Sequence, residues 1–420
     1  MKIGYACLVV GVPDTGMKTT RKANATPERL TELIAHNLKA MENMIDYNIA
    51  NGIKLYRISS DIIPFGSDYE TNQLNWADIF KNELNSIAKK IEKHGLRVSM
   101  HPGQYTVLNS KDVNIVKRAI EDLEYHTAFL DALNLDQSHK IILHVGGVYG
   151  DKISAVDRFI DTYQTLSPAI KNRLIIENDD RLYTIEDVLE ISQRTGAPVV
   201  YDNLHNAANP SNVSTTDAEW IQKVQETWTQ ADGATKIHYS QQRKDARVGA
   251  HTETIYIEPF MAFYKSIEPL GVDIMLEVKD KNLSAVKVNA TISKQQEIRL
   301  LEKEWARYKY LVLSKSQHNY QAIRSLLKDK TKYPAVAFYS LIEQALDMPS
   351  VKTNEQNALE HVWGHLKKEA TEKERNQFQT RKTKWLENEM TTKTLKNWLK
   401  RLAEKYEESY LLESLYFDIH

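Results

Sequence analysis

The sequence predicts an α/β protein: a TIM (β/α)8 barrel with an appended all-α C-terminal domain. Two observations support this prediction. In the first two-thirds of the 420-residue chain, eight short apolar segments alternate with amphipathic segments, the pattern of a parallel barrel. After about residue 290 no strand-like segment remains, and long charged amphipathic stretches continue to the end. We therefore expect a barrel domain over 1–290 and a helical domain over 291–420, with the boundary within 282–295.

The eight predicted strands are short, rich in Ile, Val and Leu, and bounded by Gly, Asn, Asp or charged residues. They lie at 2–10, 53–61, 96–103, 139–147, 173–179, 198–204, 235–241 and 272–280. Helices are expected at 27–47, 77–94, 112–133, 153–168, 185–195, 217–227 and 256–268. The first has a clear start signal, because Thr26 can cap it and Pro27 suits the first helical position. A doubly wound open sheet is the alternative fold.

Composition excludes several classes of protein. No run of about 18 apolar residues is present, so no membrane-spanning helix is expected. The N-terminus lacks the pattern of a signal peptide, and the single cysteine, Cys7, excludes intramolecular disulfides and argues against thiolate zinc sites. These features predict a cytoplasmic protein. The formal net charge of −1 gives no global signal for nucleic acid, so a DNA-binding surface must be local.

Histidines and carboxylates gather where the predicted strands end. The set comprises His101, His144, Glu177, Asp202, His205, His238 and Glu277, with His251 in the loop before the last strand. Side chains alternate along a strand, so Ile142 shares a face with His144, as Lys236 does with His238. Each ligand candidate can then be the last inward residue at the C-terminal mouth, where barrel enzymes carry their chemistry. Six ligand-bearing strand ends also converge better in a closed barrel than in an open sheet.

This residue set predicts a site for several cations. Imidazole and carboxylate without thiolate suit Mn²⁺, Zn²⁺ or Fe²⁺, and eight candidates suggest two or three ions. Clustered cations suit phosphodiester hydrolysis. A purely structural role is disfavoured, because burying so many titratable groups without partners is costly. Lys236 is open to two interpretations: a barrel lysine paired with a carboxylate, or a carboxylated lysine that bridges metals. Isolated histidines are expected to be structural: His36, His94, His126, His139, His318, His361 and His365.

Over about residues 1–285 the motifs HPGQY, LHVGG, IENDD, YDNLH, KIHYSQ and LEVKDK resemble the ultraviolet damage endonuclease family. The resemblance implies a TIM barrel related to that of endonuclease IV and cleavage immediately 5′ to a photoproduct, which leaves a 3′-hydroxyl. It implies that Lys236 is the family's modified lysine and acts with Glu177 and His238 in catalysis. The family's metal ligands fall on His101, His144, Glu177, Asp202, His205, Lys236, His238, His251 and Glu277. Mn²⁺ is favoured, with Zn²⁺ or Mg²⁺ as alternatives. One departure is Asp68, which stands where the family usually carries a histidine.

The resemblance also implies residues that contact damaged double-stranded DNA. Gln104 and Tyr105 match the pair that the family pushes into the duplex, although an ordinary turn after Pro102 is the alternative. Tyr5, expected to face inward on the first strand, resembles a further lesion-site aromatic, with core packing as its alternative. Phosphate contacts are expected from Lys18, Arg21, Lys22, Arg243, Lys244 and Arg247, and Asn178 and Lys279 flank metal ligands.

Three other functions remain open from sequence. An abasic-site endonuclease of the endonuclease IV type would use similar metals, but the Gln-Tyr loop and Lys236 argue against it. A sugar isomerase on the same barrel would bind two cations without needing a basic rim. The segment over about 300–418 resembles a helical domain of unknown function, so a recruitment protein with the barrel as damage sensor is a third alternative. Protein partners are not predicted.

Overall fold

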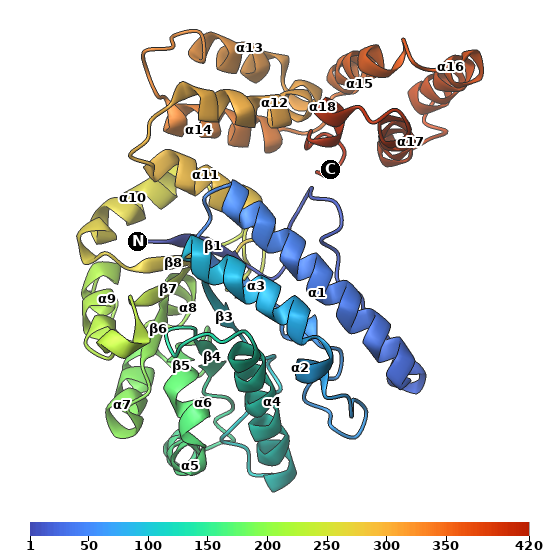
Figure 1. The fold of residues 1–420 in the computed structure, drawn as a ribbon. Helices are drawn as coiled ribbons and strands as arrows, with labels where there is room; N and C mark the ends of the chain where they lie inside the picture. The colour runs from blue at the N-terminus through green and yellow to red at the C-terminus, as the bar shows by residue number, and fades with distance from the viewer. Residues whose placement is uncertain (420) are drawn as a thin grey trace. The chain divides into compact units, whose positions relative to one another are not determined.

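The computed structural model describes residues 1–419, and its first part is a closed barrel of eight parallel strands (Figure 1). The strands pair in chain order, and β8 closes against β1. They are β1 Ile3–Ala6, β2 Leu55–Ile58, β3 Arg97–Met100, β4 Ile141–His144, β5 Leu174–Glu177, β6 Val199–Asp202, β7 Lys236–Tyr239 and β8 Asp273–Leu276. Each strand lies within its predicted segment, so the barrel is confirmed and the open sheet is wrong.

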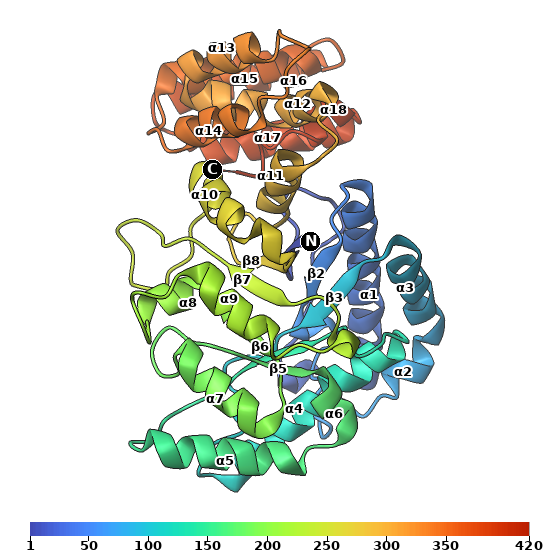
Figure 2. The same cartoon turned by 90° about the vertical axis from the view of Figure 1, so that its left-hand side faces the viewer.

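Helices surround the strands, as the views in Figures 1 and 2 show. The predicted ones are α1 Pro27–Ala50, α2 Trp76–Ile79 with α3 Lys81–His94, α4 Val113–Ala132, α5 Lys152–Thr165, α7 Ile185–Thr195, α9 Asp217–Gln225 and α10 Ile257–Ile267. The side chain of Thr26 caps α1 by accepting a hydrogen bond from the backbone N–H of Arg29, as predicted. Short 3-10 turns lie at Lys22–Asn24, Ser60–Ile62, Gln230–Asp232 and Glu268–Leu270.

Three further helices were not predicted. Two are short: α6 Pro168–Arg173 and α8 Asn203–Ala208. The third, α11 Asn282–Ile292, occupies the segment that the sequence suggested as a domain boundary. That segment is a helix with a buried first part.

The barrel interior follows the predicted alternation of side chains. Ala6, Leu55 and Met275 pack together although they come from three strands, and Ile142 packs with Ile175 in a second group. Ile142, Ile175 and Met275 share strand faces with ligand candidates two positions further along: His144, Glu177 and Glu277. The C-terminal mouth therefore receives the candidate ligands, while apolar side chains fill the interior below them.

The packing of the chain divides it into two compact units. The first comprises residues 1–9, 13–255 and 259–289, and the second comprises 10–12, 256–258 and the chain from Ala290 onward. The helices of the second unit are α12 Ile298–Lys315, α13 Gln317–Leu326, α14 Ala335–Leu346, α15 Lys352–Leu366, α16 Glu372–Leu386, α17 Thr392–Lys405 and α18 Ser409–Leu412. Aromatic rings form much of its core, with Trp363 stacked on Phe378 at 4.2 Å between centroids. Within residues 1–419, no helix has the length and apolar character needed to cross a membrane.

Candidate metal centre

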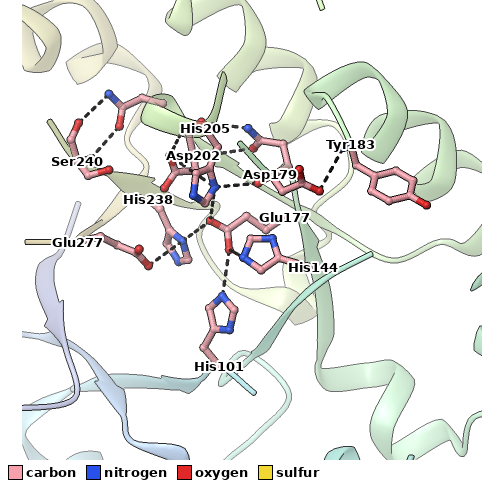
Figure 3. A network of polar contacts seen from close by, with 12 residues as sticks. His101, His144, Glu177, Asp179, Tyr183, Asp202, His205, His238, Ser240 and Glu277 are labelled. Carbon is pink, nitrogen blue, oxygen red and sulfur yellow. Dashed lines mark hydrogen bonds and ion pairs between the residues drawn. The ribbon is translucent and has the colours of Figure 1, made fainter. Parts of the chain in front are cut away.

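The candidate ligands meet around the carboxylate of Glu177, the last residue of β5 (Figure 3). Glu177 is only 1% exposed, and four imidazoles surround it. The Nδ1 atom of His238 lies 2.7 Å from Oε1, and the Nε2 atom of His101 lies 3.2 Å from Oε2. His144 and His205 approach the same carboxylate at 3.7 and 3.6 Å. Residues from strands β3 to β7 and the loops after them thus converge on one buried anion.

The donor atoms fit two neighbouring cations. His101, His144 and Glu177 form one group of three whose ligand atoms lie within 4.8 Å of one another. A second group of three, whose ligand atoms also lie within 4.8 Å of one another, comprises Glu177, Asp202 and His238. Glu177 therefore belongs to both groups. Buried atoms in these groups also lack hydrogen-bond partners: Nδ1 of His144, Oδ2 of Asp202 and Nε2 of His238. Since buried polar atoms are rarely left unpaired, these atoms mark places for a ligand.

The charges around Glu177 shift the pKa values of its neighbours in opposite directions. Burial would raise the pKa of Glu177, but His238 and His144 hold it well below its usual range. Burial lowers the pKa of His101 to about 4, so this imidazole is neutral at pH 7. Burial would also lower the pKa of His205, yet Asp202, Glu177 and other carboxylates raise it to about 9. In the metal-free protein His205 is therefore a cation that compensates the buried carboxylates.

Glu277 joins the group from the end of β8. Its Oε1 atom lies 3.3 Å from Nδ1 of His238, and its Oε2 atom lies 4.0 Å from Nε2 of His251. It also forms an ion pair with Arg57, a residue of β2 that the sequence analysis did not single out. Burial would raise the pKa of Glu277, but Arg57 and His238 lower it strongly. A signal for Arg57 was available, because it shares the inward face of β2 with Leu55.

Lys236 is buried on β7, two residues before His238 on the same strand face, and is 1% exposed. Burial lowers its pKa well below the ordinary value, and the nearby guanidinium groups of Arg97 and Arg57 lower it further. Asp273, its partner in the register with β8, acts in the opposite direction. Lys236 therefore lies deeper in the barrel than the candidate ligands at the mouth, and the lowered pKa favours the neutral form of its amine.

His251 stands at the base of a hairpin-like loop between β7 and α10. Gln242 and His251 form an antiparallel bridge. The side chain of Gln242 closes the loop, accepting a hydrogen bond from the N–H of Gly249 at 2.8 Å and donating one to the carbonyl of Arg247 at 2.9 Å. The tip that carries Lys244 is exposed. The same short loop thus connects an exposed basic tip to a candidate metal ligand.

Asn178 supports the ligands without belonging to them. Its side-chain amide donates to the carbonyl of Asp202 at 3.1 Å, and its side-chain oxygen accepts from the N–H of Asp202 at 2.9 Å. Its own carbonyl lies 3.0 Å from Nδ1 of His205. Asn178 therefore fixes the ends of β5 and β6 relative to each other, as its position beside Glu177 suggested. Lys279 instead pairs with Glu253 at 2.9 Å.

The loop with Gln104 and Tyr105 projects into solvent. Tyr105 is 83% exposed, and the loop turns through a hydrogen bond from the N–H of Thr106 to the carbonyl of Gly103 at 3.0 Å. A pocket of about 770 Å³ lies beside it, lined by His101, Tyr105 and Asp68 among others. The carboxylate of Asp68 is bound to Lys22 at 2.8 Å and lies outside the two metal groups.

Two other expectations have definite outcomes. Tyr5 does not face inward: it is fully buried, and its hydroxyl donates to Asn48 on α1 at 2.7 Å, outside the barrel.

The structural role predicted for His126 and His139 is confirmed. His126 is buried and lies 2.8 Å from the hydroxyl of Ser60, and His139 accepts a hydrogen bond from the backbone of β3.

The cations expected to contact phosphates lie at the mouth, in the loops after β1 and β7. All six are exposed: Lys18, Arg21, Lys22, Arg243, Lys244 and Arg247. Two of them are paired with nearby carboxylates, Lys22 with Asp68 and Arg243 with Glu253 at 3.1 Å.

A family model described as UV-endonuclease UvdE matches residues 1–309. The chain belongs to this family. It is 37% identical over 414 residues to a UV DNA damage endonuclease of Clostridium perfringens, a match that covers 97% of each chain. It is 36% identical over 260 residues to one from Bacillus cereus, covering 61% of this chain and 81% of the relative.

The structural comparison agrees with this membership. The crystal structure of SacUVDE aligns with a TM-score of 0.65 and 36% identity, covering 70% of this chain and 99% of that one. A second family model, described as a protein of unknown function, matches residues 309–420. The UvdE membership supports the damage-endonuclease interpretation over the abasic-site endonuclease and sugar isomerase alternatives.

The charge state of His205 leads to a prediction about metal binding. Because its pKa is about 9 in the metal-free protein, His205 must lose a proton before it can bind a cation. Mn²⁺ binding near pH 7 should release close to one proton at this residue, and affinity should rise as the pH increases from 7 to 9. Calorimetry in buffers of different ionisation enthalpy measures the release. His205→Ala should remove it, and an unchanged proton count in that variant would contradict the assignment.

Proposed function

We propose that this protein is a DNA repair endonuclease that nicks the phosphodiester immediately 5′ to ultraviolet photoproducts and leaves a 3′-hydroxyl. The observation that carries the proposal is the group of imidazoles and carboxylates around Glu177 at the barrel mouth. Membership of the UvdE family and relatives named UV DNA damage endonuclease supply the substrate class. Damaged double-stranded DNA is the proposed partner.

The proposed cofactors are two or three divalent cations, with Mn²⁺ favoured over Zn²⁺ or Mg²⁺. The residues that would hold them are His101, His144, Glu177, Asp202, His205, His238, His251 and Glu277. Such cations supply an activated water and stabilise the leaving oxygen in phosphodiester hydrolysis. Formation of a 3′-hydroxyl requires that the bond between phosphorus and O3′ breaks. Glu177 would orient both ligand groups, Asn178 would keep Asp202 in place, and Arg57 would keep the Glu277 carboxylate ionised.

Lys236 is proposed to carry a carboxylate on its amine. The neutral amine attacks carbon dioxide, a nitrogen–carbon bond forms, and the nitrogen loses a proton, so the product is an anionic carbamate. The lowered pKa of Lys236 favours the neutral, nucleophilic form. A carbamate would extend from Lys236 towards the metal ligands and change a neutral amine below them into an anionic ligand. It would then act with Glu177 and His238.

Recognition of the lesion is proposed to occur beside the metals. A photoproduct stacks and pairs poorly, so it costs less to displace from the duplex than an intact dinucleotide. The ring of Tyr105 can replace the lost stacking, and the amide of Gln104 can bond to exposed base edges. The pocket beside them offers room for a displaced base. Lys18, Arg21, Lys22, Arg243 and Lys244 would hold the phosphates around this point. Tyr5 is too deeply buried to take part in this conformation.

A nicking assay tests the proposal directly. Three end-labelled duplexes are incubated with the protein and Mn²⁺: one with a defined photoproduct, one with an abasic site and one undamaged. The expected result is a cut immediately 5′ of the photoproduct and none in the undamaged duplex. Cutting at the abasic site alone would replace the proposal with an endonuclease IV activity. Tight binding to damage without any cut would favour the recruitment alternative.

The metal assignment predicts the effect of two substitutions. Glu177→Gln and His238→Ala should each lower the nicking rate at least about a hundredfold, since even residues that support metal ligands contribute roughly 10–100-fold. The metal content of the purified protein, measured by mass spectrometry, should fall in parallel. His318→Ala, an exposed histidine of the helical unit, is the matched control and should behave like the parent. Activity within a few-fold of the parent in both ligand variants would contradict the assignment.

The exposed loop predicts a different phenotype. Replacing Gln104 and Tyr105 with alanine should leave metal content unchanged, because neither residue belongs to the metal groups. The ratio of affinities for photoproduct and undamaged duplexes should fall by about tenfold, since base–aromatic stacking contributes roughly 1–3 kcal/mol. Competition binding of the two duplexes measures this ratio. A loss of metal with an unchanged ratio would show that the loop supports the metal centre instead.

A further inference from the structure

A groove of about 650 Å³ lies along α16 in the second unit, and none of the residues that line it is assigned to the metal centre. Three cationic side chains line it: Lys373, Arg381 and Lys384. Neutral hydrogen-bonding side chains lie between them, namely Asn376, Gln377 and Thr380. Both lysines are exposed, and Arg381 is partly buried. This is the residue composition of surfaces that contact phosphate oxygens, where Lys and Arg act together with Thr, Asn and Gln.

The three cations of this groove form no close ion pair. Among residues 1–419, no carboxylate lies within 4.0 Å of the charged nitrogens of Lys373, Arg381 or Lys384. Glu374, the acidic residue next to Lys373, is engaged elsewhere: it accepts hydrogen bonds from Lys405 at 2.7 Å and from Thr371. Glu372 lines the groove near its N-terminal end. The chain as a whole has a net charge of −1, so this concentration of free cations is not a consequence of general basicity.

The spacing of these residues matches an extended anionic ligand. Positions 373, 377, 381 and 384 recur every three or four residues and therefore share one face of α16. From Lys373 to Lys384 the helix rises about 16 Å, at about 1.5 Å per residue. A DNA strand presents one phosphate per roughly 3.4 Å of axis, so this face spans several phosphates. A single small anion would leave at least one end of the groove unused.

The guanidinium of Arg381 is already restrained. It lies 5.3 Å from the ring centroid of Trp398 on α17, a residue of the buried core of this unit. Ordering a long side chain on binding costs free energy, and a stacked guanidinium has lost part of that freedom beforehand. Stacking on one face leaves the N–H groups at its edge available to phosphate oxygens. The groove thus has a restrained cation near one end and an exposed lysine on either side of it.

We propose that the groove on α16 is a second DNA-binding surface that contacts the phosphate backbone and reads neither sequence nor damage. This proposal rests on the proposed function for the identity of the ligand. It assigns a role to the helical unit that the family description leaves without one. The residues that line the groove are three cations, three neutral polar residues, Glu372 and Met390, and none of them has an aromatic ring on which a base could stack. The groove would therefore bind intact and damaged duplexes equally.

Salt-dependent binding by the full-length protein tests this surface. The variant replaces Lys373 and Lys384 with glutamine, and its binding to a fluorescent undamaged duplex is measured without added metal between 50 and 200 mM salt. Each lost phosphate contact reduces the slope of log affinity against log salt by about 0.9, so the slope should fall by about 2. Affinity near 0.1 M salt should fall by at least about tenfold. A duplex that carries a photoproduct should lose affinity by the same factor.

A matched control removes the same charge elsewhere. Lys328 and Lys367 are exposed lysines of the same unit outside the groove, and their glutamine double variant should keep the parent slope within about 0.5. The charge-reversal variant Lys373→Glu with Lys384→Glu should lose more affinity than the glutamine variant, and thermal unfolding checks that each protein folds.

Two results would overturn the proposal: equal slopes in the groove and control variants, or a loss confined to the damaged duplex. Failure of the proposed function is separate, because it appears as absent nicking by the parent protein.

Discussion

The buried carboxylate of Glu177 is the constraint on which the mouth of the barrel depends. A carboxylate that is 1% exposed is costly unless partners surround it, and here four imidazoles from four other elements do so. These partners come together only when parallel strands end side by side. The metal centre therefore depends on the native pairing of the barrel strands. A change of one residue in the register of β5 would turn Glu177 outward and destroy the centre.

The barrel and most of the candidate ligands could be predicted because the information is local. Alternation with a period of two places Ile175 and Glu177 on one face whatever the rest of the chain does. Helix α11 was missed because this local signal is absent. Its residues from Asn282 to Val288 are all buried, so no polar face alternates with an apolar one. A helix buried on all sides cannot be told from a connection by its periodicity.

Two other features required knowledge of distant residues. Alternation places Arg57 on the inward face of β2, but its partner Glu277 lies 220 positions away, and no local pattern reveals that pairing. The direction of Tyr5 depends on how little room β1 leaves inside the barrel. A side chain added at Gly4 would come within 1.9 Å of the carbonyl oxygen of Leu55, and the interior position beyond it is occupied by Ala6. Large rings on β1 must therefore turn outward to α1, where Tyr5 finds Asn48.

The distribution of free cations suggests a division between affinity and discrimination. Lys22 and Arg243 at the barrel mouth are partly neutralised by Asp68 and Glu253, which weakens their hold on any phosphate. Phosphate contacts near the metals contribute binding energy that is common to intact and damaged DNA, and this energy cancels in the ratio of affinities that defines specificity. Discrimination then depends on the cost of displacing a base beside Tyr105. The cations of α16 can supply affinity for DNA of any sequence. This affinity lengthens the time that the protein stays on DNA without reducing that ratio.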